Sequence, residues 1–141
     1  MAVLKFNGYN VDELTYIKKT EKEFGDHLDT ISPLVKVELK VDEENGKGVV
    51  SLDIRSRQED NLPFNFSVIV IGKFSYSKKE DINEYGLEHL LQYNAVAILY
   101  PYARSLVSNL TSSSNEFPGL ILPTVNVAEL LSDDSESKPK S

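Results

Sequence analysis

Residues 34–42 decide the fold, and they read Leu-Val-Lys-Val-Glu-Leu-Lys-Val-Asp. From residue 35 onward, apolar side chains alternate with charged ones: Val35, Val37, Leu39 and Val41 against Lys36, Glu38, Lys40 and Asp42. Successive side chains of a strand point to opposite faces, so a period of two separates an apolar face from a charged one. The segment is therefore predicted to be a half-buried antiparallel strand, with one face toward a core and the other toward water.

Two further strands follow this one. The turn Glu44-Asn45-Gly46 carries Asn-Gly, a strong hairpin signal because both residues tolerate positive φ. Residues 49–57 then resume the period of two, and the polar residues 58–63 lead into a third run from Phe64 to Tyr76. We predict a three-stranded meander.

The third run is apolar on both faces in its second half. Phe66, Val68 and Val70 line one face, while Ile69 and Ile71 make the other face apolar as well. Such a strand needs cover on both sides. The second cover comes either from another subunit or bound segment, with Ile69 and Ile71 as candidate oligomer-interface residues, or from a loop of the same chain. Gly72 is expected to mark a bulge or bend.

The N-terminal residues 3–19 are predicted to form one long bent strand or two short ones. Leu4 and Phe6 stand at alternate positions, as side chains on one face of a strand do, and so do Leu14 and Tyr16. Gly8 is a candidate kink between the two pairs. Residues 20–33 are polar and are expected to be a crossing loop.

Helical patterns begin after residue 78. A short helical piece around Leu87–Leu91 precedes a longer helix, in which Val96, Leu99, Ala103, Leu106 and Leu110 form one apolar stripe. Pro101 lies inside that helix, where it removes a backbone donor and is expected to cause a kink or a break. Strands come first and helices after, so the fold class is α+β.

The C-terminal part contains an extended apolar segment. Prolines forbid a helix over residues 117–123, so this segment must lie either in the chain's own core or beside a groove that accepts an extended peptide. A short helix is predicted at Val127–Leu131. Residues 1–131 are then a single domain, and residues 132–141 a disordered polar tail.

Composition excludes several functions. The chain has 141 residues and a net charge of −7, which suits one domain and argues against nucleic-acid binding. It has no cysteine, no secretory signal pattern and no long apolar run, so a cytoplasmic protein without membrane insertion is expected. Neither His27 nor His89 lies in a metal-binding or catalytic motif, so we expect no metal, no cofactor and no enzyme.

A resemblance to a known family emerges from the second half of the chain. The stretch Ile98-Leu99-Tyr100-Pro101-Tyr102-Ala103-Arg104 is followed by Phe117-Pro118, Leu120, Leu122, Val125-Asn126-Val127 and Leu130. Over residues 94–131 this pattern closely resembles the C-terminal half of the SecB protein-export chaperones. Gly72-Lys73-Phe74-Ser75 adds a weaker match.

The resemblance implies a SecB-like four-stranded antiparallel sheet with two helices packed on one face. It also implies a homo-oligomer, dimer or tetramer, that holds unfolded polypeptides without ATP. The residues expected to line or shape the client groove are Leu99, Tyr102, Phe117, Leu120, Leu122, Val125 and Leu130.

The family also docks the translocation ATPase SecA through acidic residues on the sheet. One of these acids falls at Glu13, whereas the others fall at Ile17 and Ser67, and a neighbouring apolar contact falls at Asn65. The docking surface is therefore mostly not retained, which puts SecA as a partner in doubt.

Two hypotheses follow for the function. The first is a cytoplasmic, ATP-independent holdase that binds extended apolar segments of unfolded or precursor chains. The alternative is a SecB-fold protein that serves one dedicated partner, such as an antitoxin-like client, or acts only as an assembly module.

Overall fold

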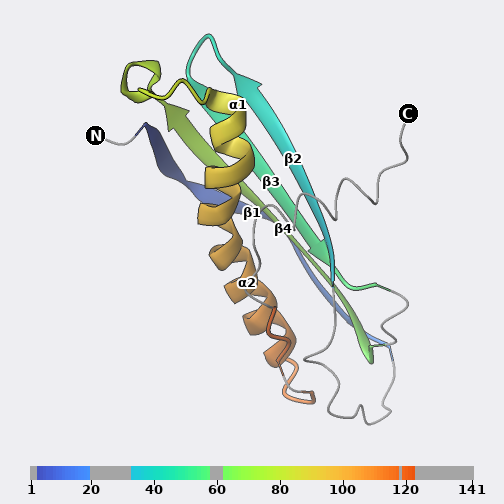
Figure 1. Ribbon diagram of the computed structural model, residues 1–141. Helices are drawn as coiled ribbons and strands as arrows, with labels where there is room; N and C mark the ends of the chain where they lie inside the picture. The colour runs from blue at the N-terminus through green and yellow to red at the C-terminus, as the bar shows by residue number, and fades with distance from the viewer. Residues whose placement is uncertain (1–2, 20–32, 58–61, 118, 123–141) are drawn as a thin grey trace.

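The computed structural model describes residues 3–19, 33–57, 62–117 and 119–122. Its elements in chain order are β1 (Leu4–Lys18), β2 (Leu34–Asp42), β3 (Lys47–Arg55), β4 (Phe64–Tyr76), η3 (Lys78–Glu80), α1 (Leu87–Leu90), η4 (Leu91–Ala95) and α2 (Val96–Ser112). The strands form one antiparallel sheet in the order β1-β4-β3-β2, and α1, η4 and α2 follow one another along one face of it (Figure 1). This confirms the α+β fold class.

One main helical segment covers the sheet in the described part of the chain. The second predicted helix, at Val127–Leu131, lies outside the described residues, as do most of the predicted crossing loop and the tail of residues 132–141. The prediction that the segment after the main helix is not helical is confirmed for residues 119–122, which belong to no helix or strand.

The predicted meander is confirmed. β2 and β3 pair from Leu34 with Arg55 to Asp42 with Lys47 without a register shift. The hairpin closes through Asn45, whose backbone N–H and side-chain amide both donate to the Asp42 carboxylate, and through Gly46, which has a φ of 60°. These hydrogen bonds hold the pKa of Asp42 below its usual value.

β1 is one long strand bent by two irregularities. Its pairing with β4 shifts between Phe6 and Tyr9 and again between Val11 and Glu13, and Gly8 within the first shift has a φ of 105°. Because each shift adds a residue, the face that begins with Leu4 and Phe6 continues through Tyr9, Val11 and Leu14.

The expectation of a bulge at Gly72 is wrong. The irregularity lies in β1, opposite Gly72 and Phe74, while Gly72 itself pairs regularly with Val50 of β3. Gly72 allows close packing instead, because a Cβ atom there would lie 3.0 Å from Leu99 Cδ1 and 3.0 Å from Phe74 Cε1. A side chain at this position would force the side chains of Leu99 and Phe74 to shift by a few tenths of an ångström.

The predicted helical stripe is partly corrected. Val96, Leu99 and Ala103 are fully buried, but the inward line continues through Val107 rather than through Leu106, which is only half-buried. Of the kink or break expected at Pro101, the break does not occur, because α2 runs through Pro101 to Ser112. Pro101 lies on the exposed side of the helix, while Leu99 and Ala103 anchor the opposite side in the core.

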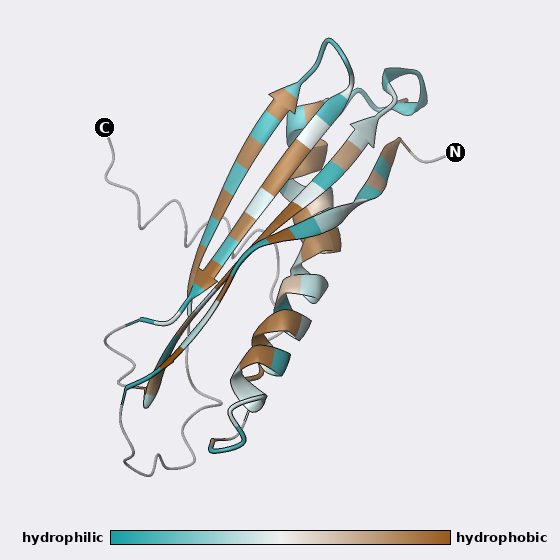
Figure 2. Ribbon diagram, turned by 180° about the vertical axis from the view of Figure 1, so that it is seen from behind, coloured by the Kyte–Doolittle hydropathy of each residue, from teal (hydrophilic) through white to brown (hydrophobic). Residues whose placement is uncertain are grey.

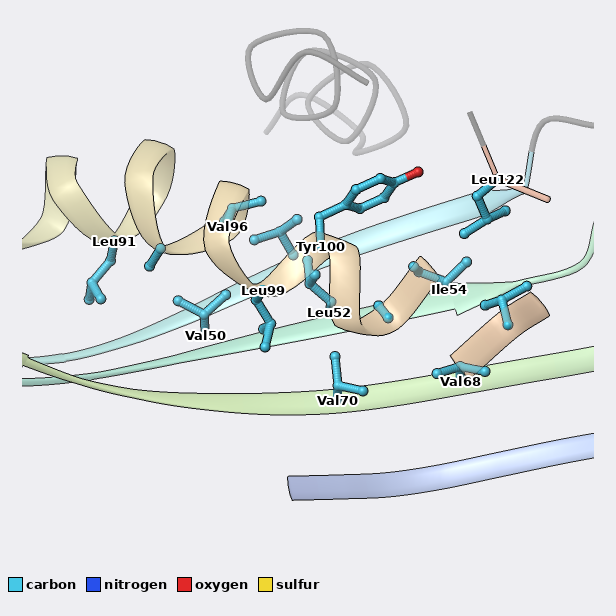
Figure 3. Packing of buried hydrophobic residues seen from close by; sticks show 14 of the residues in the cluster. Val50, Leu52, Ile54, Val68, Val70, Leu91, Val96, Leu99, Tyr100 and Leu122 are labelled. Atoms are coloured by element: carbon cyan, nitrogen blue, oxygen red, sulfur yellow. The ribbon is translucent and has the colours of Figure 1, made fainter. Parts of the chain in front are cut away.

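The core lies between the helix and the sheet. Val50, Leu52 and Ile54 of β3 and Val68 and Val70 of β4 point toward the helix and are fully buried, as Figure 3 shows. Burial of such side chains contributes about 1.5–3 kcal/mol each. The helix therefore divides its face of the sheet into two flanks, one toward β1 and one toward β2.

Candidate functional site

Apolar side chains remain exposed along the β1 side of α2, which we call the open flank. It consists of Tyr9, Val11, Leu14 and Tyr16 on the helix-facing side of β1 and of Tyr102 on α2. Val11 is 41%, Leu14 48% and Tyr102 40% exposed. Single exposed apolar residues are ordinary, but successive ones on one face of a strand are typical of a binding surface.

Aromatic clusters close both ends of the open flank. At one end, the ring of Tyr102 lies 5.5 Å from that of Phe6 and 4.8 Å from that of Tyr9. At the other end, Phe64 stacks on Tyr16 at 5.0 Å and lies 5.9 Å from Phe117. These large rings are fixed by their neighbours, so they offer apolar surface with little ordering cost to a ligand.

The phenol oxygen of Tyr16 has an unusual environment. It is buried and has no hydrogen-bond partner among the residues that the structure describes. A buried hydroxyl without a partner costs about 1–3 kcal/mol.

The opposite side of α2, toward β2 and β3, is filled by residues 119–122 and is called here the sealed flank. Leu120 and Leu122 are each only 1% exposed, whereas Ile121 between them is 67% exposed. Figure 3 places Leu122 on the side of the helix where Tyr100 and Ile54 lie. The burial of Tyr100 raises the pKa of its phenol.

Two side chains of α2 form hydrogen bonds with the backbone of residues 119–122 on the sealed flank. The Leu120 N–H donates to Thr111 Oγ1 at 2.8 Å, and Arg104 Nε donates to the Leu122 carbonyl at 2.7 Å. Both backbone groups would otherwise be buried without partners beside the helix. Arg104 therefore bonds the chain's own backbone and helps to hold residues 119–122 against the helix.

The structure separates the seven predicted groove residues. Leu99, Leu120 and Leu122 lie in the core, so they do not line an open surface here and could only shape one. Tyr102 is half-exposed on the open flank, and Phe117 packs at its end. Val125 and Leu130 lie outside the described residues.

Sequence reasoning missed the contribution of β1. Val11 and Leu14 share the helix-facing side although their positions differ in parity, because the shift between Val11 and Glu13 adds a residue. The apolar residues of 9–16 were visible in the sequence, but only the position of the bulges aligns them.

The outer face of the sheet, away from the helix, is mixed in character. Figure 2 views the sheet from this side, and the colours that alternate along each strand belong in turn to residues of the two faces. Ile69 and Ile71 are half-buried there and, with Val49, line a hollow of about 490 Å³. The rest of its lining is polar, and includes Lys36, Lys40, Asp12, Glu38 and Asp53. None of the described residues covers Ile69 and Ile71 as strongly as the helix covers the other face.

Glu13 lies on this outer face but is already engaged. Its carboxylate accepts a hydrogen bond from the Ser67 hydroxyl. Ile17 and Asn65, which the resemblance aligns with other docking residues of the family, face each other on β1 and β4. Nearby, Asp53 pairs with Arg55 at 2.7 Å and raises the pKa of the guanidinium.

The helix start carries a stack of three rings. His89 lies between Tyr85 and Tyr93, at centroid distances of 5.4 and 4.7 Å. Within the described parts of the chain, no group of three or more His, Cys, Asp or Glu side chains could hold a metal ion. No helix in those parts is long and apolar enough to cross a membrane.

Comparisons with solved structures support the fold. The SecB-like chaperone Rv1957 of Mycobacterium tuberculosis, solved with a ChAD peptide from the HigA1 antitoxin, superposes with a TM-score of 0.66. The identity is 17%, over 86% of this chain and 90% of that chain. A Streptococcus agalactiae protein of unknown function gives a TM-score of 0.52 at 15% identity, over 86% and 97% of the two chains.

Sequence comparisons extend to nearly the whole chain. An uncharacterized protein of Methanocaldococcus jannaschii, MJ0357, is 28% identical over 147 residues, which cover 99% of this chain and 90% of that protein. The model of the family described as preprotein translocase subunit SecB matches residues 21–138. Since that match covers most of the chain, the protein belongs to the SecB family.

Proposed function

We propose that this protein is a cytoplasmic, ATP-independent holdase that binds extended apolar segments of unfolded or precursor polypeptides on its open flank. The observation that carries the proposal is the run of exposed apolar side chains at Val11, Leu14 and Tyr102, on the fold of a chaperone family. A solved SecB-like relative of the same fold holds a peptide.

The physical basis of binding is apolar burial. Each square ångström removed from water contributes roughly 25 cal/mol before the costs of ordering the client. Side chains without charges discriminate little between apolar sequences, so many clients would fit. The net charge of −7 would keep the loaded complex soluble and would favour clients with basic flanks.

The test is aggregation of a chemically denatured, slow-folding client diluted into the protein without ATP. We expect suppression at about one client per oligomer, and loss of suppression in Leu14→Lys. Ile17→Lys is the matched control, because Ile17 is 57% exposed on the same strand but lies on the outer face. Equal suppression by both folded variants would exclude the open flank as the binding surface.

A second candidate function is the binding of one dedicated protein partner. It is supported by the structure of Rv1957, which contains a peptide from one antitoxin. The aggregation assay, repeated with several unrelated denatured clients, distinguishes the two candidate functions. A general holdase suppresses the aggregation of most of them, whereas a dedicated protein leaves them to aggregate as they do alone.

Docking to SecA has weaker support. Of the acids expected on the outer face only Glu13 is present, and Ser67 already bonds its carboxylate. We therefore propose the outer face as a surface for a protein partner or another copy, with Ile69 and Ile71 at its apolar centre and SecA as one candidate.

A further inference from the structure

The chain contains two Asn-Gly pairs, and the fold places them in different surroundings. They are Asn7-Gly8 in β1 and Asn45-Gly46 in the β2–β3 hairpin. Asparagine is a chemically labile residue. A following glycine makes it more so, because glycine has no Cβ atom to hinder attack of its own nitrogen on the asparagine side chain. Whether either asparagine reacts in the folded protein therefore depends on how firmly the fold holds each pair.

Hydrogen bonds hold the pair in the hairpin. The side-chain amide of Asn45 donates to the Asp42 carboxylate at 2.9 Å, and the Asn45 backbone N–H donates to the same carboxylate at 3.2 Å. The Gly46 N–H donates to the Glu43 carbonyl at 3.3 Å, and the Gly46 carbonyl accepts a hydrogen bond from the Tyr76 N–H at 2.8 Å. Attack by the Gly46 nitrogen on Asn45 would require several of these bonds to open together.

The pair in β1 is held less firmly. The register shift between Phe6 and Tyr9 leaves Asn7 and Gly8 without a one-to-one partner on β4. The Asn7 amide donates to the hydroxyl of Ser75 at 2.6 Å, and a neutral acceptor gives a weaker bond than a carboxylate. A Cβ atom on Gly8 would meet nothing within 4 Å beyond its chain neighbours, so the main chain has room to move there.

The charges around the two pairs also differ in sign. Ser75 pairs with Lys5 of β1 on one side and with Lys47 of β3 on the other. The Lys47 ammonium donates to the same hydroxyl as the Asn7 amide, at 3.3 Å. The hairpin pair instead follows three consecutive acidic residues, at 42–44. Negative charge develops on the attacking nitrogen and on the side-chain oxygen during deamidation, so nearby lysines favour the reaction and nearby carboxylates oppose it.

We propose that Asn7 is a site of spontaneous deamidation in the folded protein, and that Asn45 is protected from it. The Gly8 nitrogen forms a bond to Asn7 Cγ, the bond between Cγ and Nδ2 breaks, and ammonia leaves with the proton of the Gly8 N–H. Water then opens the cyclic imide at either of its carbonyl groups. Opening at Cγ gives aspartate, and opening at the main-chain carbonyl gives isoaspartate.

The modified residue would lie in the bulge that sets which side chains of β1 face the helix. Isoaspartate adds a carbon atom to the main chain, so the residues after it would lose their present alignment with β4. Tyr9, whose ring lies 4.8 Å from that of Tyr102, comes soon after it. The consequence rests on the proposed function: the isoaspartate form should bind clients on the open flank less well than the unmodified protein.

The test is long incubation of the folded protein in neutral buffer, followed by proteolysis and mass spectrometry to locate aspartate and isoaspartate. We expect Asn7 to deamidate at least about tenfold faster than Asn45 in the folded protein. In urea, where both asparagines keep only their neighbouring glycine, the rates should differ by less than about threefold. No reaction at Asn7, equal rates in the folded protein or a faster reaction at Asn45 would overturn the proposal.

Two variants of the hairpin test why Asn45 is protected. Asp42→Ala removes the acceptor of both Asn45 hydrogen bonds, so the Asn45 rate should rise about tenfold. Glu43→Ala is the matched control, because it removes a neighbouring carboxylate but keeps the backbone carbonyl that Gly46 bonds. Equal acceleration in the two variants would overturn the assignment of this protection to the Asp42 hydrogen bonds.

The variant Asn7→Ser tests the consequence, because it cannot deamidate at this position and Asn7 is exposed. After the same incubation, the wild type should suppress client aggregation less than before, and the variant should suppress it as well as when fresh. Equal losses in both proteins would overturn the link to the open flank. Fresh protein that suppresses no aggregation would overturn the proposed function instead, and the mapping of Asn7 and Asn45 would still decide the modification site.

Discussion

The two flanks of α2 are built from similar residues but end in different states. Toward β2, Leu120 and Leu122 are each only 1% exposed. The side chains of Thr111 and Arg104 form hydrogen bonds with the backbone of that segment. Toward β1, Val11 and Leu14 remain close to half exposed beside rings that are packed and fixed. One flank is completed by residues 119–122, and the other is left apolar and open by the part of the chain that the structure describes.

This difference indicates what each flank contributes. Burial on the sealed flank stabilises the fold, because those leucines leave water when the chain folds. Val11 and Leu14 gain little from folding, since much of their surface stays in water. Their apolar character is therefore better explained by a partner than by stability, and the two flanks should respond differently to substitution.

The largest effect on stability is expected on the sealed flank. Leu122→Ala removes a fully buried side chain and leaves a cavity beside Ile54 and Tyr100, so the free energy of unfolding should fall by about 2–5 kcal/mol. Urea unfolding measures it. Ile121→Ala is the control, because Ile121 is 67% exposed and should change stability by less than about 0.5 kcal/mol. Equal effects of the two substitutions would mean that the segment is not seated in the core.

The sequence was sufficient to predict the sheet. A period of two between residues 34 and 76, broken at Asn45-Gly46, yields the strands β2, β3 and β4, because alternation decides which face each side chain occupies. The helix was also predicted, but its uninterrupted run through Pro101, where a kink or a break was expected, was not. Local propensity was overridden by the burial of Leu99 and Ala103 on the opposite side of the helix.

The candidate site was harder to predict from the sequence. An extended Leu-Ile-Leu segment looks the same whether it fills a core or lines a groove, so burial of Leu120 and Leu122 could not be decided from their pattern. On β1, alternation fails because two bulges add residues, and Val11 joins Leu14 on one face only through that insertion. Both the burial of the leucines and the alignment on β1 depend on tertiary packing, which a local sequence pattern does not reveal.

A smaller effect on stability is expected when Asp81 is replaced. This residue precedes the helix and so supports both flanks alike. Its carboxylate accepts hydrogen bonds from the N–H groups of Gly86 and Tyr85 and from the Tyr76 hydroxyl. The bond from Gly86 is the largest cause of a lowered pKa of Asp81 in the folded state. The ionised carboxylate of Asp81 therefore contributes fully to stability above the ordinary carboxyl pKa, about 3.9. This contribution is lost as the pH falls through the lowered pKa that Asp81 has in the folded protein.

The variant Asp81→Asn tests this linkage. At pH 7 it should lower the melting temperature by a few degrees, since the charged acceptor is lost. As the pH falls below about 4, the wild type loses the same contribution, so the difference between the two proteins should narrow. A difference that stays constant from pH 7 to pH 3 would mean that the charge of Asp81 contributes nothing.

The smallest effect on stability is expected on the open flank. Leu14 is 48% exposed, so Leu14→Lys keeps an aliphatic stem over the surface and places its charge in water. The free energy of unfolding should change by less than about 0.5 kcal/mol in urea titrations at low protein concentration. A loss of more than about 1.5 kcal/mol would show that Leu14 is covered in solution. In that case, the protein itself or a second copy would complete this flank, and the contrast between the two sides of α2 would disappear.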